Sequence, residues 1–264
     1  MIKTAIIPVA GRGTRLHPVT LCVPKELLPV YTTPLLQFAI EEAEASGIER
    51  FIFVTRDGKE AIEDFVRMTF PGIDAHFLRQ AEPLGLGHAV LTAGGLARQG
   101  ESGDLPVAVI LPDDLIFAPT PVLAQMARAY DTDMSYHMVA AMKVAPDEVS
   151  SYGIVDADVP APGRAMPVRG LVEKPAEGTA PSTLAVVGRY ILHPGIFETL
   201  MTTGRGAGGE IQLTDAIARD LRRMDVSAFR FEGVRFDCGV PDGLLEAGCA
   251  IQDAREMLEQ GSAA

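Results

Sequence analysis

The sequence predicts an α/β protein with a mixed, mainly parallel, doubly wound sheet and helices on both faces. Short apolar, β-branched runs alternate in the first half with segments whose apolar residues recur at helical spacing, and such alternation is typical of parallel sheets. The 264 residues suffice for one large domain with a substantial core. Hydrophobic residues make up 47% of the chain and charged residues 22%, as in ordinary globular proteins.

The first half alternates strands and helices. The patterns predict strands at 3–9, 50–55, 75–78 and 106–111, and helices at 34–46, 59–69 and 87–97. In parallel sheets, ligands bind at the carboxyl ends of the strands. The loop at residues 10–15 and the Pro112-Asp113-Asp114 turn both fall there, so we expect them to face one pocket.

The second half changes to strand-like apolar pieces separated by turns rich in Pro and Gly, at 136–144, 151–156, 167–173 and 184–192. Because no long polar linker precedes it, we expect it to extend the same sheet and to carry a second substrate. Helices are predicted again at 210–224 and 244–259. The last helix either packs on its own domain or pairs with a second subunit, which would make a homo-oligomer.

Charge and cysteine content exclude several classes of protein. The net charge of −12 disfavours binding to nucleic acid or to an anionic membrane. The sequence has neither an apolar run of membrane-spanning length nor a cleavable leader. Its three cysteines, without metal-ligand spacing, fit a reducing compartment, so we expect a cytoplasmic protein.

The loop after the first predicted strand has the composition of a phosphate-binding turn. Arg15 and Lys25 would supply positive charge, and successive backbone N–H groups could approach an anion closely. The residues that keep the turn small are Ala10, Gly11, Gly13 and Thr14. A glycine-rich turn after a strand is also common in α/β proteins without a ligand, so the loop alone is weak evidence.

Two familiar phosphate motifs fit this loop badly. The dinucleotide fingerprint requires a third glycine where Leu16 stands. The P-loop requires Gly-Lys-Ser/Thr, which occurs nowhere in the chain. The sequence therefore argues against a dehydrogenase and against an ordinary ATPase.

Aspartates at strand ends are candidate metal ligands. Asp113 follows the apolar run 107–111 and faces the predicted phosphate loop, with Asp114 as its immediate competitor. Asp237 follows another strand-like segment. Mg²⁺ commonly uses one or two protein carboxylates plus substrate phosphates, so Asp113 and Asp237 would suffice. The alternative for an Asp pair after a strand is a solvated turn.

Two further segments carry polar groups suited to small ligands. Glu173 and Lys174 place an acceptor beside a cation at a strand end, which suits a sugar phosphate. Gln80, followed by Gly85, offers a two-way hydrogen-bonding amide to a pyrimidine edge. Each is more often a surface feature when it occurs alone.

These motifs together resemble those of the sugar-1-phosphate nucleotidyltransferases, over residues 2–247. The resemblance rests on VAGRGTR at 9–15, PKELLP at 24–29, GLGHAV at 85–90, ILPDD at 110–114, SYGIVD at 151–156, VEKP at 172–175, VGRY at 187–190, GGEIQLTDAI at 208–217 and FDCG at 236–239. It implies a Rossmann-like fold in one domain over 1–264. That domain would have a nucleotide-binding half at 1–134, a sugar-binding half at 135–240 and a C-terminal helix at 241–264.

The resemblance also implies roles for individual residues. The triphosphate would be held by Ala10, Gly11, Gly13, Thr14, Arg15 and Lys25, and Glu26 would position the substrates. Gln80 and Gly85 would recognise the base. Asp113 and Asp237 would hold Mg²⁺, and Lys174 would neutralise the sugar phosphate. The sugar itself would contact Gly153, Glu173 and Val186. Arg15, Lys25, Lys174 and Asp113 would carry the chemistry.

The implied reaction transfers a uridylyl group from UTP to α-D-glucose 1-phosphate and releases pyrophosphate. GLGHAV, ILPDD and GGEIQLTDAI favour this uridylyl branch, whereas GTRLHPVTL and LLPVY resemble the thymidylyl branch, which uses dTTP. A catalytically silent sugar-nucleotide-binding protein is the alternative of another class. A full set of phosphate-binding and metal-binding residues argues against that alternative.

Overall fold

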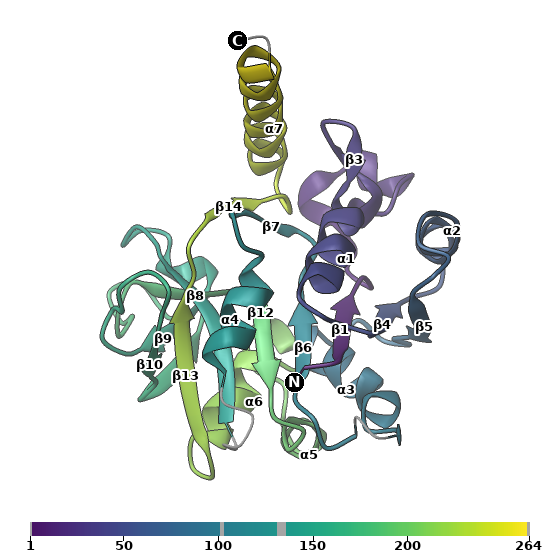
Figure 1. Ribbon diagram of the computed structural model, residues 1–264. Coiled ribbons are helices and arrows are strands. Elements are labelled where there is room, and N and C mark those ends of the chain that lie inside the picture. The colour runs from purple at the N-terminus through teal and green to yellow at the C-terminus, as the bar shows by residue number, and fades with distance from the viewer. Residues whose placement is uncertain (1, 101–102, 131–135, 263–264) are drawn as a thin grey trace.

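The computed structural model describes residues 2–100, 103–130 and 136–262. One large mixed sheet forms the centre of the molecule, with helices on both faces, as the sequence predicts (Figure 1). Its strand order is β10-β13-β8-β12-β6-β1-β4-β5, with β9 and β11 joined beside β12. Strands from both predicted halves therefore lie in the same sheet. The predicted division at residues 134 and 135 lies outside the described residues.

The first half supplies four parallel strands of the sheet, and the second half adds the parallel pair β8 and β13. The four strands of the first half run β6-β1-β4-β5 and all pair in parallel: β1 (Thr4–Pro8), β4 (Arg50–Thr55), β5 (Asp74–Arg79) and β6 (Val107–Ile110). The predicted helices lie between them: α1 (Leu35–Ala45), α2 (Glu60–Thr69) and α3 (Leu86–Ala97). Because β1 and β6 are parallel neighbours, the loops that follow them emerge side by side at one edge.

The second half joins the sheet through an antiparallel strand. β12 (Leu184–Leu192) pairs antiparallel with both β6 and β8 (Tyr136–Lys143). The outer strands are β9 (Gly153–Asp156), β10 (Arg164–Pro167), β11 (Gly170–Glu173) and β13 (Asp225–Arg230). The remaining helices are α4 (Val122–Ala129), α5 (Ile196–Met201), α6 (Leu213–Asp220) and α7 (Pro241–Ser262). Helix α6 is shorter than the predicted range 210–224 at both ends. The residues before it form a turn, closed by Gln212 Nε2 donating to Ala207 O at 2.9 Å, and those after it form a second turn, in which the N–H of Arg223 donates to Asp220 O at 2.8 Å.

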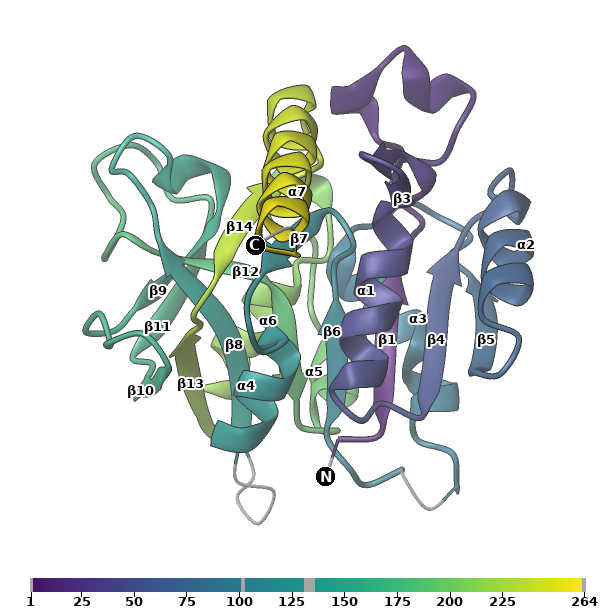
Figure 2. The ribbon, with the colours of Figure 1, turned by 45° about the horizontal axis from the view of Figure 1, so that its top comes forward.

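Two large apolar clusters hold the helices to the sheet. Successive β1 residues face opposite sides, so Ile7 packs in the cluster with α1, α2 and α4, and Ile6 in the cluster with α3, α5 and α6. Both side chains are fully buried. Figure 2 shows α1 and α4 on one face of the sheet and α3, α5 and α6 on the other. Because the strands are covered on both faces, their sequences are nearly continuous apolar runs.

A small antiparallel ribbon lies above the strand ends. β7 (Asp114–Phe117) pairs with β14 (Val234–Asp237), which brings Asp237 opposite Asp114. A third apolar cluster packs the start of α7 against this ribbon, and the rest of α7 extends away from the body (Figure 1). Among the described residues, no helix is both long and apolar enough to cross a membrane.

Candidate active site

The loop after β1 folds back on itself and places Lys25 beneath it. Gly13 has φ of 64°, a left-handed conformation that glycine adopts without strain. A Cβ there would lie 3.1 Å from Thr20 and 3.2 Å from Lys25, so both side chains would have to shift slightly to accommodate it. Thr20 Oγ1 donates to the carbonyl oxygen of Gly13 at 2.7 Å, which closes the loop.

A cavity of about 420 Å³ opens at this edge of the sheet. Asp113 of the β6 turn also lines it, so the two loops face one pocket as predicted. Its walls contain eight of the predicted nucleotide-binding residues: Ala10, Gly11, Gly13, Thr14, Lys25, Glu26, Gln80 and Gly85. The structure thus brings together residues that come from several separate segments of the first half of the chain.

Gln80 and Gly85 form one wall of this cavity. Gln80 Nε2 donates to the carbonyl oxygen of Gly85 at 3.1 Å and lies 2.9 Å from His88 Nδ1. Gly85 has φ of 93°, and a Cβ there would come within 2.6 Å of Glu210. Since the Gln80 NH₂ group is already engaged, its amide oxygen is the group left to accept a hydrogen bond from a ligand.

A second cavity of about 220 Å³ adjoins the first. The two share Leu86, Leu111 and Asp113 in their walls. The second contains all four predicted sugar-site residues, Gly153, Glu173, Lys174 and Val186, together with Asp237. It also contains Arg15, which the sequence assigned to the triphosphate loop and which does not line the first cavity.

Lys174 has an unusual backbone at this site. Its φ is 45°, in the left-handed region that residues other than glycine seldom adopt. Its N–H donates to the carbonyl oxygen of Tyr152 at 3.0 Å, which holds the residue in place, and its side chain is half exposed. Strained backbone of this kind gathers at ligand sites. The ammonium group of Lys174 lies 3.9 Å from Glu173 Oε1, and Lys174 lines the second cavity, where it can meet an anion.

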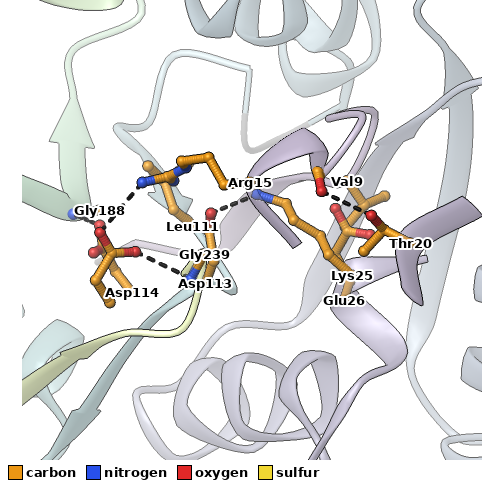
Figure 3. Close-up of polar contacts among 12 residues, drawn as sticks. Val9, Arg15, Thr20, Lys25, Glu26, Leu111, Asp113, Asp114, Gly188 and Gly239 are labelled. Atoms are coloured by element: carbon orange, nitrogen blue, oxygen red, sulfur yellow. Dashed lines mark hydrogen bonds and ion pairs between the residues drawn. The ribbon is translucent and has the colours of Figure 1, made fainter. Parts of the chain in front are cut away.

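Each candidate metal carboxylate is paired with a candidate phosphate-binding cation. Lys25 Nζ donates to Asp113 Oδ2, as Figure 3 shows, and Arg15 Nη1 lies 3.5 Å from Asp237 Oδ2. Burial opposes ionisation of Asp113, but the Lys25 ammonium, together with a backbone hydrogen bond and Arg15, holds the pKa of Asp113 below its usual range. Burial likewise opposes the charge on Lys25, but the carboxylates of Asp113 and Glu26 raise its pKa. Both partners are therefore charged.

The two carboxylates converge on one point. A Cβ built on Gly239 would lie 3.0 Å from Asp237 Oδ1, 3.1 Å from Asp113 Oδ2 and 2.5 Å from Arg15 Nη2, so the Arg15 guanidinium borders the same point. The β7–β14 ribbon fixes this approach, since the N–H of Cys238 donates to the carbonyl oxygen of Asp113 at 2.8 Å. Hard carboxylate oxygens arranged in this way fit a divalent cation that takes its other ligands from substrate and water. Among the described residues, no group of three or more His, Cys, Asp or Glu is arranged as a metal site.

Glu26 forms a buried ion pair that the sequence did not reveal. Its Oε2 accepts a hydrogen bond from Lys59 Nζ at 2.7 Å, and Lys59 also donates to the carbonyl oxygen of Val9 at 2.7 Å. The side chains are 1% and 4% exposed. Burial raises the pKa of Glu26 above its usual range, with Lys59 and Lys25 acting in the opposite direction. Glu26 Oε1 is buried and has no hydrogen-bond partner among the described residues, and Glu26 lines the first cavity.

Asp114, the competitor of Asp113, has a structural partner for each oxygen. Oδ1 accepts from Arg235 Nε at 2.6 Å, and Oδ2 accepts the N–H of Gly188 at 2.7 Å. Arg235 Nη1 also donates a hydrogen bond to the Tyr152 hydroxyl at 2.9 Å, and Arg235 lines the second cavity. Sequence reasoning missed Arg235, although its position two residues before Asp237 on an alternating strand places both on the same face.

Cys238 lies beside these groups but is unsuited to attack. Its side chain is fully buried. Burial, together with the carboxylates of Asp113 and Asp237, raises the pKa of the Cys238 thiol to about 12. The thiol therefore stays protonated at neutral pH.

In an α/β fold, two adjoining cavities that are lined by a cationic glycine loop and a pair of carboxylates indicate a group-transfer enzyme for phosphorylated substrates. The chain belongs to the nucleotidyl transferase family, whose model matches residues 4–254. Members of this family generally use a divalent metal ion.

Named relatives are similar to almost the whole chain. UTP–glucose-1-phosphate uridylyltransferase YngB of Bacillus subtilis (strain 168) is 39% identical, with 98% of this chain and 93% of the relative aligned. The Pseudomonas aeruginosa UTP–glucose-1-phosphate uridylyltransferase is 40% identical, with 94% of this chain and 95% of the relative aligned.

Solved structures agree with this family. A UDP-glucose pyrophosphorylase complexed with UDP-glucose superposes with a TM-score of 0.88 at 39% identity, covering 96% of this chain and 100% of that one. A glucose-1-phosphate thymidylyltransferase from Bacillus anthracis has a TM-score of 0.78 at 21% identity, with 96% of each chain covered. The latter likeness extends to the fold alone.

Proposed function

We propose that the protein transfers a uridylyl group from UTP to α-D-glucose 1-phosphate, giving UDP-glucose and pyrophosphate. The observation that carries this proposal is the pair of adjoining cavities that share Asp113, one walled by the glycine loop and the other by Glu173 and Lys174. A nucleotide in the first cavity and a sugar phosphate in the second would meet at Asp113. Similarity at 39% identity to the uridylyltransferase YngB over nearly the whole chain supports the choice of substrates.

The proposed chemistry is an in-line displacement. An oxygen of glucose 1-phosphate attacks the α-phosphorus of UTP, a new P–O bond forms, and the bond to the β-phosphate bridging oxygen breaks to release pyrophosphate. The protonated thiol of Cys238 supports direct transfer without a covalent enzyme intermediate. The barrier lies mainly in bringing two polyanions together, so positioning and charge stabilisation dominate.

The site contains three cationic side chains that could stabilise the negative charge of the two substrates. Lys25 and Arg15 are held by Asp113 and Asp237 before substrate arrives, and an entering triphosphate would compete for both. Lys174 faces the second cavity, where it would neutralise the sugar phosphate. Asp113 and Asp237 are the residues that would hold Mg²⁺. The ion would supply positive charge to phosphate oxygens during transfer.

The two halves of the chain would divide recognition. Residues 1–134 would bind the nucleotide, with the amide oxygen of Gln80 accepting the N3–H of uracil and Gly85 allowing the base to lie close. Residues 135–240 would bind glucose, with Glu173 and the backbone of Gly153 meeting its hydroxyls beside Val186. Uracil and thymine both carry the N3–H, so Gln80 by itself does not separate the two bases.

The test is release of pyrophosphate from purified protein with Mg²⁺ and glucose 1-phosphate, supplying UTP, dTTP, ATP, CTP or GTP in parallel. We expect release with UTP far above release with dTTP. Omission of glucose 1-phosphate is the control for nucleotide hydrolysis. A preference for dTTP would contradict the uridylyl assignment, and tight UDP-glucose binding without turnover would favour a silent binding protein.

We further propose that the protein works in the cytoplasm without nucleic-acid or membrane partners. Its net charge of −12 opposes contact with polyanions. Cys22, Cys238 and Cys249 are all unpaired, which is typical of a reducing compartment.

Helix α7 supports a proposal of self-association. Its first turns pack against the same chain, because Leu244, Ala247 and Ile251 belong to the apolar cluster over the β7–β14 ribbon. Leu245 and Met257 are 68% and 75% exposed, and apolar surface of this kind commonly marks an interface. We expect light scattering after size exclusion to give a homo-oligomer that Met257→Asp weakens. A monomeric mass for the unmodified protein at micromolar concentration would contradict this.

A further inference from the structure

Arg189 is a buried cation directly behind the candidate active site. It lies on β12, between Gly188 and Tyr190, which both line the second cavity. Its side chain is 2% exposed and ranks first by volume among the fully buried side chains of the described residues. A charged side chain buried inside a protein requires hydrogen-bond and ion-pair partners. The partners of Arg189 therefore indicate its role.

One side of the Arg189 guanidinium holds the turn that carries Asp113. Nη1 donates to the carbonyl oxygen of Asp114 at 2.6 Å and lies 3.3 Å from that of Leu111. Gly188 next to it adds two more bonds. Its N–H reaches Asp114 Oδ2 at 2.7 Å, and its carbonyl oxygen accepts from the N–H of Leu111 at 2.8 Å. Both ends of the turn at 111–114 are therefore hydrogen-bonded to β12. Figure 3 shows Leu111, Asp114 and Gly188 close to Asp113.

The other side of Arg189 is held by Glu42 of α1. Nε donates to Glu42 Oε1 at 3.1 Å, and Nη2 donates to Oε2, which is a forked pairing. Glu42 Oε1 also accepts the N–H of Leu123, in the first turn of α4, at 3.0 Å. The carboxylate thus neutralises the guanidinium and fixes its plane, so that Nη1 points at the turn.

The strand itself is adapted to this contact. The pairing of β12 with β8 shifts register between Val187 and Tyr190, so the regular ladder is interrupted at Gly188 and Arg189, as in a β-bulge. A Cβ on Gly188 would lie 2.5 Å from Asp114 Oδ2, so glycine is needed for the close approach. Bulges often redirect a side chain beside an active site.

We propose that Arg189, oriented by Glu42, is a positioning residue for nucleotidyl transfer. It would hold the turn at 111–114 so that the carboxylate of Asp113 meets that of Asp237 at the point near Gly239. This inference rests on the proposed function. Stability alone explains the pair poorly, because well-packed apolar residues can often replace a buried ion pair without loss of stability. Displacement of a reacting group by about 1 Å costs roughly 10²-fold in rate.

The test removes both charges together. The double variant Glu42→Gln/Arg189→Met leaves no unpaired ion, and the introduced glutamine keeps an amide oxygen as acceptor for the N–H of Leu123. We expect kcat to fall roughly 10- to 100-fold. The KM for glucose 1-phosphate should change by less than about twofold, because Glu173 and Lys174, the predicted sugar-phosphate contacts, make no hydrogen bond or ion pair with Arg189 or Glu42 in the described part of the chain. Binding of Mn²⁺ in the presence of UTP, followed by electron paramagnetic resonance, should weaken several-fold.

A second variant guards against misfolding of the first. Arg189→Lys keeps a charge for Glu42, but one ammonium group lacks the planar fork that reaches the carboxylate and the carbonyl oxygens together. We expect the same loss of kcat and of Mn²⁺ binding with a near-native circular dichroism spectrum.

The matched control breaks another buried pair far from the site. His137 Nε2 lies 3.0 Å from Asp220 Oδ2. His137 is at the start of β8, so the pair lies at the end of the sheet opposite to the candidate active site. His137→Gln should lower Tm while kcat and Mn²⁺ binding stay unchanged.

Unchanged kcat and Mn²⁺ binding in both Arg189 variants would overturn the positioning role, as would an equal loss in His137→Gln. Failure of the proposed function would look different. The unmodified protein would then release no pyrophosphate with any nucleotide, whereas weakened Mn²⁺ binding in the Arg189 variants would still report the positioning of Asp113.

Discussion

Asp113→Asn is expected to lower kcat/KM by roughly 10² to 10³ while leaving the protein folded. Asp113 lies in the walls of both cavities and faces Asp237 across the point near Gly239. The amide keeps the shape of the side chain but removes the charge that would hold Mg²⁺ and that now pairs with Lys25. Pyrophosphate release at several Mg²⁺ concentrations measures the effect. Higher Mg²⁺ should restore part of the activity, because the variant binds the ion more weakly.

The control for this substitution is Asp242→Asn. Asp242 lies in the first turn of α7, is exposed, and follows Asp237 by only five positions. It makes the same change of charge at the surface nearby, and we expect turnover to stay within about twofold, as for most surface substitutions. Near-normal turnover of a folded Asp113→Asn protein would contradict the assignment of Asp113 to the chemistry.

Lys59→Met is expected to lower the free energy of unfolding more than the other proposed single substitutions. Lys59 and Glu26 are 4% and 1% exposed, and removing Lys59 leaves a carboxylate buried without its partner. Breaking a buried pair in this way costs about 3 kcal/mol at neutral pH. For a chain of this size, that corresponds to a drop in Tm of roughly 6 to 12 °C. Differential scanning calorimetry measures it.

The loss of stability in Lys59→Met should depend on pH. The pKa of Glu26 is already above its usual 4.5 in the folded protein because of burial, and it rises further when Lys59 no longer lowers it. A carboxyl group with a raised folded pKa binds more protons when folded, so stability falls as pH rises between the unfolded and the folded pKa. The deficit of the variant should be small at acidic pH and largest above the folded pKa of Glu26.

A double variant provides the control for this interpretation. Glu26→Gln/Lys59→Met removes both charges, so its stability should exceed that of Lys59→Met at neutral pH and should lose the added pH dependence. Activity is not the readout here, because Glu26 lines the first cavity. A deficit in Lys59→Met that is equal at acidic and neutral pH would indicate lost packing of the lysine stem instead of an unpaired carboxylate.

Local patterns were sufficient for the long elements of the fold. The predicted strands at 50–55 and 184–192 match β4 and β12 residue for residue, because continuous apolar runs between turns are typical of strands covered on both faces. Helix α5 was missed because its six residues are too few to establish a helical period. Strand β13 also went unrecognised, because its sequence DVSAFR continues from the end of a helical pattern.

The sequence by itself determined the fold class, the family and the segments that meet at the site. Parallel neighbours β1 and β6 must present their following loops at one edge, so residues 10–15 and 113 were predicted to share a pocket, as they do except for Arg15. The roles assigned to individual site residues stay predictions until the variants are measured.

Only the tertiary structure decided how the charges pair. Arg189 meets Glu42 across 147 positions of sequence, and Lys59 meets Glu26 across 33. It also decided that Arg15 turns to Asp237 and the second cavity. Such pairs depend on how packed helices and strands align their side chains, and the low dielectric of the interior then makes each pairing strong. A local pattern of residue types carries no record of that alignment.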